Sequence, residues 1–172
     1  AEVLFCGYGF QINDPEKKWN DYEGMDVSGK WVMVLRGNPL PEQNQTIYEN
    51  WSADRDKAMV AMDQGASGII FVSGPQFDPY DELMSLKTKE SRVGIPAIHL
   101  NRNGADRILK ASGHSVENLE KKINKNLRSF SFNTGVKVKG SAEIIPQKVK
   151  TYNVAGFIEG SDLLKKDQWI IL

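Results

Sequence analysis

The sequence contains two unbroken apolar runs of strand length, WVMVL at residues 31–35 and GIIFV at residues 68–72. Between them, residues 54–64 carry acidic side chains in the first turn and end just before a glycine, a pattern typical of a capped helix. A strand, a helix and a strand in this order predict a βαβ unit with parallel strands and a right-handed crossover. The run at residues 31–35 also predicts a strand that is buried on both faces.

Further elements flank this unit on both sides. Apolar runs predict strands at residues 2–6 and 96–100. A short helix closed by Gly113 is predicted at residues 103–112, and apolar positions at helical spacing predict a helix at residues 116–126. Polar stretches rich in glycine or proline predict three long loops, at residues 11–30, 38–53 and 73–94.

The pattern changes at residue 128. Apolar positions then alternate and are interrupted by Gly135 and Gly140, which is typical of an antiparallel hairpin. The predicted fold class is therefore α/β, with mixed sheets or a partly open barrel, βαβ units and few helices.

The composition excludes several classes of protein. The chain has 172 residues, 22 Lys and Arg against 22 Asp and Glu, and 40% hydrophobic residues, which together indicate a folded module without the basic excess of a nucleic-acid-binding protein. No uncharged apolar run approaches the roughly 20 residues that cross a bilayer. The single cysteine excludes an internal disulfide and any zinc site with several cysteines.

Few side chains offer metal binding or catalysis. The histidines are His99, expected to be a structural or partly exposed strand residue, and His114, expected to be solvated in a turn. Cys6 lies in an apolar run and is expected to behave as a small hydrophobic residue. No base, nucleophile and orienting group come together from nearby positions, so no catalytic or metal-binding residue is predicted. A small enzyme that uses His99 is kept as one hypothesis for the function, beside the two that are given at the end of this section.

The predicted loops carry acidic and aromatic side chains and two glycosylation sequons. A calcium site at Asp78, Asp81 and Glu82 is conceivable, but a solvated acidic loop is favoured because the order of EF-hand ligands is absent. Loop aromatics either clamp the loops onto the core, which is favoured, or line a recognition surface. The aromatics in question are Trp19, Tyr48 and Trp51, and the sequons begin at Asn44 and Asn50.

An ordered set of segments carries a family resemblance: FCGYGF at residues 5–10, WNDYEGMDVSGKWVMVLRGNP at residues 19–39, GASGIIF at residues 65–71 and IPAIHL at residues 95–100. Together they resemble the protease-associated (PA) domain of secreted zinc aminopeptidases, in the family that also holds glutamate carboxypeptidase and the transferrin receptor. The resemblance implies the swivelling β/β/α fold of that domain.

The resemblance also implies domain boundaries. Residues 1–127 would form the PA core, and residues 128–150 an antiparallel hairpin that completes or flanks it. Residues 151–172 are similar to the segment that opens the peptidase domain, so the chain is expected to be a fragment that ends before the first zinc ligand. A C-terminal hairpin left without its partner strands could pack on a neighbouring molecule and support an oligomer.

The function implied by the resemblance is non-catalytic. The domain would cover the active-site cleft of a zinc-dependent exopeptidase (an aminopeptidase), with its peptidase domain and peptide substrates as partners. It would hold no cofactor, and two zinc ions would lie in the absent peptidase domain. The candidate substrate-facing residues are Arg36, Tyr48, Trp51 and Tyr80, of which Arg36 could grip a peptide carboxylate or instead satisfy nearby backbone carbonyls.

Two further expectations accompany this function. The family is extracytoplasmic, so a secreted, periplasmic or cell-surface location is expected. The alternative function is a freestanding protein-binding or sorting module of the same fold.

Overall fold

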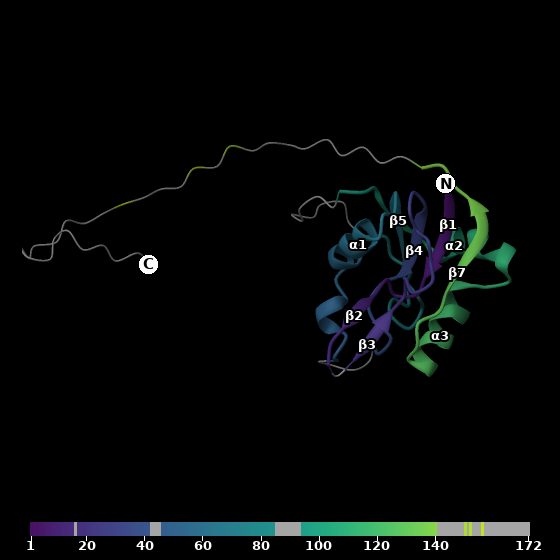
Figure 1. The fold of residues 1–172 in the computed structure, drawn as a ribbon, viewed down its shortest axis with the longest axis horizontal. Helices are drawn as coiled ribbons and strands as arrows, with labels where there is room; N and C mark the ends of the chain where they lie inside the picture. The colour runs from purple at the N-terminus through teal and green to yellow at the C-terminus, as the bar shows by residue number, and fades with distance from the viewer. Residues whose placement is uncertain are drawn as a thin grey trace, which may run out of the picture. The chain divides into compact units, whose positions relative to one another are not determined.

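The computed structural model describes residues 1–15, 17–41, 46–84 and 94–140, together with residues 150, 152 and 156. The helices and strands of these residues all belong to one compact unit, Ala1–Ala142 (Figure 1). The predicted start of a peptidase domain at residues 151–172 falls outside the described residues, apart from positions 152 and 156.

The centre of the unit is a five-stranded mixed sheet with the order β6-β5-β4-β1-β7. Neighbouring strands from β6 to β1 are parallel, and β7 is antiparallel to β1. The bounds are β1 Glu2–Cys6, β4 Trp31–Leu35, β5 Gly68–Val72, β6 Ala97–Leu100 and β7 Ser131–Lys137. The predicted βαβ unit is confirmed, because β4 and β5 pair in parallel on either side of the intervening helix.

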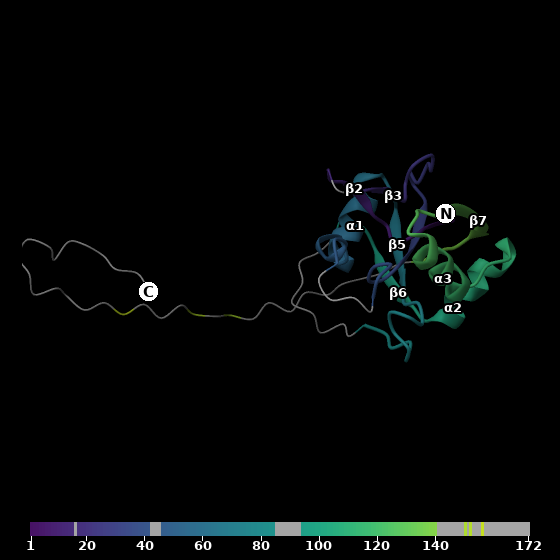
Figure 2. The same ribbon diagram turned by 90° about the horizontal axis from the view of Figure 1, so that it is seen from below.

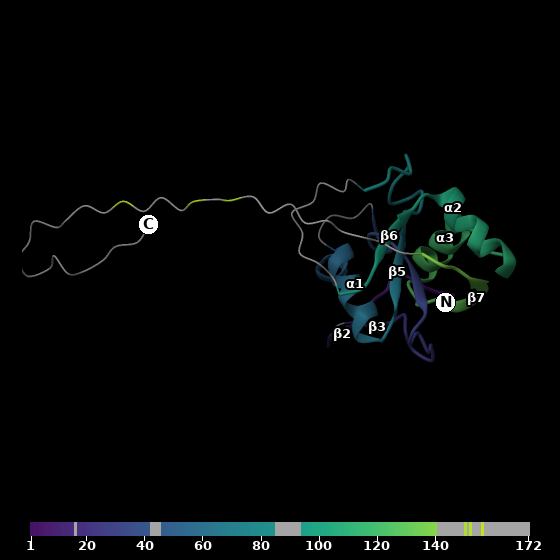
Figure 3. The ribbon, with the colours of Figure 1, turned by 90° about the horizontal axis from the view of Figure 1, so that it is seen from above.

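Helices cover both faces of this sheet (Figures 2 and 3). Helix α1 (Asp54–Asp63) lies on one face, and α2 (Arg102–Leu109) and α3 (Val116–Asn126) lie on the other. Two short 3₁₀ helices, η1 (Glu49–Trp51) and η2 (Lys110–Ser112), complete the set in the described residues. No helix in the described ranges is long and apolar enough to cross a membrane.

Alternation along the strands separates two hydrophobic cores. Successive side chains of a strand point to opposite faces, so Met33 packs with α2 and α3 while Val32 and Val34 pack with α1. All five residues of β4 are buried, as the unbroken apolar run predicts. Both helices of the first core begin at side-chain caps, since Asn101 accepts the N–H of Gly104 and Ser115 accepts the N–H of Asn118.

Three expectations need correction. The predicted loop at residues 11–30 contains an antiparallel pair of short strands, β2 (Gln11–Asn13) and β3 (Lys18–Asn20). Gly135 does not end a strand, because β7 continues through it. The pairing of β7 with β1 shifts its register between Glu2 and Leu4, and Gly135 accommodates this irregularity with a positive φ of 74°. The antiparallel partner of β7 is therefore β1, and the second half of the predicted hairpin falls mostly on residues outside the described ranges.

The third correction concerns His114, which was expected to be solvated. Its ring is half-buried and packs against two aromatic rings, with centroids 5.7 Å from Phe130 and 4.7 Å from Phe132.

Candidate functional site

The carboxyl ends of β4, β5 and β6 bring together polar side chains from distant parts of the sequence. Arg36 follows β4, Ser73 follows β5 and His99 lies within β6. Clefts outside the carboxyl ends of parallel strands are the usual ligand-binding places of open α/β sheets. This edge is therefore the first place to look for a site.

Arg36 is held by a side chain rather than by backbone carbonyls. Its Nε donates to Asp54 Oδ2 at 2.8 Å, and both side chains are 20% exposed. Its Nη1 lies 3.4 Å from Ser73 Oγ, and its guanidinium stands 5.5 Å from the centroid of the Phe77 ring. Nη2 makes no hydrogen bond to the described residues, so one edge of the guanidinium can still meet a carboxylate.

His99 and Ser73 are close, but they are not arranged as a base and a nucleophile. His99 Nδ1 accepts the backbone N–H of Met84 at 3.0 Å, which places the ring proton on Nε2. Nε2 lies 3.4 Å from Ser73 Oγ and points a proton toward it. Burial, and then the charge of Arg36, lower the pKa of His99, so the ring is neutral near physiological pH. This geometry gives no support to a small enzyme that uses His99.

The segment after β5, residues 73–84, forms a loop that is fixed from two helices. Glu120 of α3 is buried, and its carboxylate accepts the N–H groups of Gln76 at 2.8 Å and Phe77 at 3.2 Å. Arg102 of α2 donates to three carbonyls of the loop, those of Ser73, Asp78 and Pro79. The loop backbone is thereby set by charged groups from α2 and α3.

The acidic residues of this loop bind backbone amides. Asp78 accepts the N–H groups of Tyr80 and Glu82, and Asp81 accepts the N–H of Arg102 with both oxygens, at 3.1 and 2.9 Å. Asp81 also adopts a positive φ of 59°, an uncommon conformation for a residue other than glycine. Within the described ranges, no group of three or more His, Cys, Asp or Glu could hold a metal ion. The carboxylates of Asp78 and Asp81 therefore hold the loop backbone and are not simply solvated, as the sequence had suggested.

The fixed loop presents apolar side chains to solvent. Tyr80 is 84% exposed and Leu83 is 60% exposed, while Phe77 and Met84 are partly exposed beside them. The Phe77 ring also lies against Gly37, where a Cβ would overlap it. Exposed aromatic and aliphatic side chains on a fixed backbone are typical of a contact surface. We name residues 77–84 the apolar loop.

Two of the predicted substrate-facing residues lie elsewhere. Tyr48 is 1% exposed, and its ring packs against Phe10 and Trp19 in the core. Trp51, at the end of η1, is half-buried against the same core. Both therefore clamp the segment at residues 46–52 onto the core, as the favoured reading of the loop aromatics predicts. Trp19 is buried in β3.

Two charged side chains that the sequence analysis did not single out, Asp21 and Lys57, are fully buried beneath the carboxyl edge of the sheet. Asp21 accepts the N–H groups of Tyr8 and Phe10 and the indole N–H of Trp19, and burial raises its pKa to about 6. Lys57 in α1 donates to the carbonyls of Leu35 and Gly37, which is the turn that carries Arg36.

Burial lowers the pKa of Lys57 to about 7. The sequence did contain a signal for the burial of Lys57. Lys57 lies four residues before Ala61 and therefore on the same helix face, and the structure shows that both are buried.

Comparison with known proteins agrees with the fold. The family model of the PA domain matches residues 5–108, which is more than half of the chain. The match begins within β1 and ends within α2, so it includes β4, α1, β5 and β6. No curated protein matches the sequence. The mixed sheet with few helices and this match together place the chain in the PA-domain family.

Proposed function

We propose that this PA domain is an accessory domain of a zinc-dependent exopeptidase of the aminopeptidase type, and that it covers part of that enzyme's active-site cleft. PA domains are generally non-catalytic, so the domain would act through contacts alone. The two zinc ions would be held by a peptidase domain, and the protein would work outside the cytoplasm.

One observation supports this proposal above the others. The apolar loop stands beside Arg36, and its backbone is fixed by Glu120 and Arg102 before any partner arrives. A fixed surface loses little conformational entropy on binding, so its contacts can be used to orient a peptide. The unpaired edge of Arg36 would receive a peptide carboxylate, and Tyr80 would provide an apolar wall.

The test uses the full-length protein that contains this domain. Arg36→Ala and Tyr80→Ala should each raise KM for peptide substrates several-fold while leaving kcat nearly unchanged, because remote binding contacts would be lost without any loss of chemistry. Asp54→Asn is the matched control for Arg36, since it removes the ion pair but keeps the guanidinium. Unchanged kinetics in both variants would remove this surface from the cleft.

A freestanding protein-binding or sorting module is the second candidate. The exposure of Tyr80 and Leu83 favours it equally, because the same surface would serve a protein partner. The gene separates the two: a continuation rich in His and Asp after Leu172 supports the peptidase, and a stop codon or a membrane span supports the module.

A further inference from the structure

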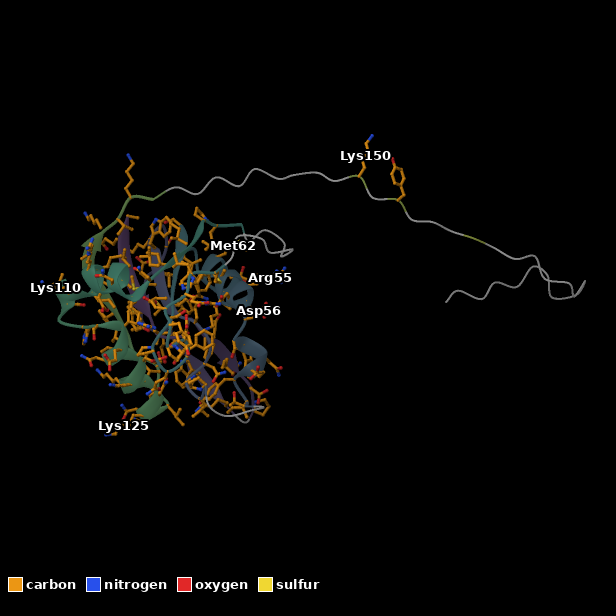
Figure 4. All side chains as sticks on the ribbon, turned by 180° about the vertical axis from the view of Figure 1, so that it is seen from behind. Arg55, Asp56, Met62, Lys110, Lys125 and Lys150 are labelled. Carbon is orange, nitrogen blue, oxygen red and sulfur yellow. The ribbon has the colours of Figure 1, made fainter. Side chains whose placement is uncertain are left out.

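The balanced charge of the whole chain conceals a strong separation of charge within the folded unit. Residues 102–139 contain nine Lys or Arg and three Asp or Glu, whereas residues 1–101 contain nine Lys or Arg and fifteen Asp or Glu. The first of these segments makes α2, η2, α3 and β7. Helix α1, on the other face of the sheet, has acidic residues in its first turn. Figure 4 shows Lys110 and Lys125 on the side of α2 and α3, away from Asp56 and Met62 of α1.

Eight of the nine cations are exposed, and we name them the basic face. They are Arg107, Lys110, Lys121, Lys122, Lys125, Arg128, Lys137 and Lys139. Among the described residues, Lys121 is the one member with a carboxylate in ion-pair contact, that of Glu117.

The other two acidic side chains of this segment do not neutralise the basic face. Asp106 accepts the N–H of Val116 at 2.7 Å, and Glu120 is buried under the apolar loop. Most of the positive charge therefore faces solvent without compensation.

The lysines of α3 stand at spacings that disfavour the free helix. Lys121 and Lys125 are four residues apart, and Lys122 and Lys125 are three apart, so these positions are neighbours on the helix surface. Like charges at these spacings destabilise a helix, and a bound anion would relieve the repulsion.

The C-terminal end of α3 also borders a depression of about 240 Å³, lined by Lys122, Ile123, Asn126, Arg128, Ser129 and Phe130. Lys122 Nζ stands 3.3 Å from the centroid of the Phe130 ring.

We infer that the basic face binds an acidic polypeptide segment, one rich in Asp and Glu. The choice of a polypeptide rests on the proposed function, in which the domain meets peptides. The large apolar side chains that are exposed in the described ranges lie outside α2, α3 and β7, so this face offers the half-buried ring of Phe130 but no exposed ring for stacking nucleotide bases and no wedge for entering a lipid layer. Six of its eight members are lysines, whose point charges suit scattered carboxylates.

The test measures binding of a fluorescein-labelled Glu-rich peptide to the 172-residue chain by fluorescence anisotropy. Binding should weaken as salt rises from about 0.02 M to 0.3 M, and the same peptide with Gln for Glu should not bind. Lys122→Glu/Lys125→Glu should weaken binding about tenfold. Lys18→Glu/Arg55→Glu changes the net charge equally on other surfaces, and it should leave the dissociation constant within about twofold. Circular dichroism checks that both variants fold.

Each other outcome overturns the inference. Equal weakening by the two double variants would mean that net charge alone is responsible. Binding of the Gln peptide would mean that the carboxylates are not recognised. If heparin or phosphatidylserine vesicles bind and the Glu-rich peptide does not, the partner belongs to another class. The assay needs no zinc and no peptidase activity, so its result is independent of whether the proposed function fails.

Discussion

The carboxylate of Glu120 occupies the space in which a side chain at Gly74 would stand. Gly74 follows β5 directly after Ser73, and Glu120 reaches it from α3, across 46 positions of sequence. The same carboxylate holds the N–H groups of Gln76 and Phe77. The close approach at Gly74 is therefore what lets α3 fix the beginning of the apolar loop.

Gly74→Ala should destabilise the unit by about 1–3 kcal/mol, because the new methyl group must displace a buried carboxylate from its hydrogen bonds. Urea unfolding followed by tryptophan fluorescence measures the change. Gly140→Ala is the matched control, since a Cβ there would meet its neighbours at an ordinary 3.5 Å and should change little. Equal stability of the two variants would show that Glu120 moves aside freely.

Arg102→Met should release the apolar loop without unfolding the core. The guanidinium donates to Asp78 O at 2.6 Å and to Pro79 O at 3.0 Å, so its removal leaves the backbone before Tyr80 without these bonds. Limited chymotrypsin digestion followed by mass spectrometry should show cleavage after Tyr80 several-fold faster than in the parent chain. Arg107→Met, which replaces an exposed arginine of the same helix, should leave the cleavage rate unchanged.

Asp21→Asn should lower stability more at acidic pH than at neutral pH. The folded-state pKa of Asp21 is raised to about 6, chiefly by burial, so its stabilising contribution is complete below the unfolded pKa and is lost as pH rises through 6. The variant cannot take up this proton. Its penalty should be about 1–3 kcal/mol near pH 7 and should grow by an amount on the order of 2 kcal/mol near pH 4.

Asp26→Asn provides the opposite sign. Asp26 is exposed, and its hydrogen bond with Lys30 lowers its pKa, so its contribution is present above the unfolded pKa and is lost on acidification. The effect of Asp26→Asn should therefore shrink as pH falls. Urea titrations of both variants at several pH values make the comparison, and parallel curves would contradict the assignment of Asp21 as a carboxyl that gains its proton on burial.

The elements that the sequence predicts well are those whose signals are local. Strands β1, β4 and β5 are continuous apolar runs, and α3 has apolar side chains at helical spacing, so each has the predicted bounds. Strands β2 and β3 have three residues each and one buried side chain apiece, Ile12 and Trp19. They form because Asp21 holds the neighbouring backbone from within the core, and an isolated pattern of three residues cannot show this.

The candidate site was predictable only in part, for a related reason. The sequence singles out Arg36 as a candidate because it ends an apolar run at a glycine, and Tyr80 because it is an aromatic residue of a polar loop, and the role of both stays a prediction. Glu120 was not predicted, because its hydrogen-bond partners lie more than 40 residues away in the sequence. In addition, a charged residue on the buried face of α3 departs from the amphipathic pattern that predicts the helix. A charged residue on an apolar helix face was the available signal at both Glu120 and Lys57.

Lys57→Met should lower stability by an amount that increases with pH. The Nζ atom donates to Leu35 O at 2.8 Å and to Gly37 O at 2.6 Å, so the variant leaves two buried carbonyls without a donor, at a penalty of about 2–4 kcal/mol. Burial lowers the folded-state pKa of Lys57 to about 7, so the unfolded chain holds the proton more tightly and the parent gains stability as pH rises above 7. The difference between parent and variant should therefore grow by an amount on the order of 2 kcal/mol between about pH 7 and pH 9.

Lys18→Met, at an exposed position of β3, should show no such dependence on pH. A difference that shrinks over this range would contradict the lowered pKa of Lys57. It would mean that the negative charges of Asp54 and Asp21 stabilise the ammonium form more than burial destabilises it. The turn that carries Arg36 would then be held by ion pairs with a charged Lys57 instead of by two hydrogen bonds from a neutral amine.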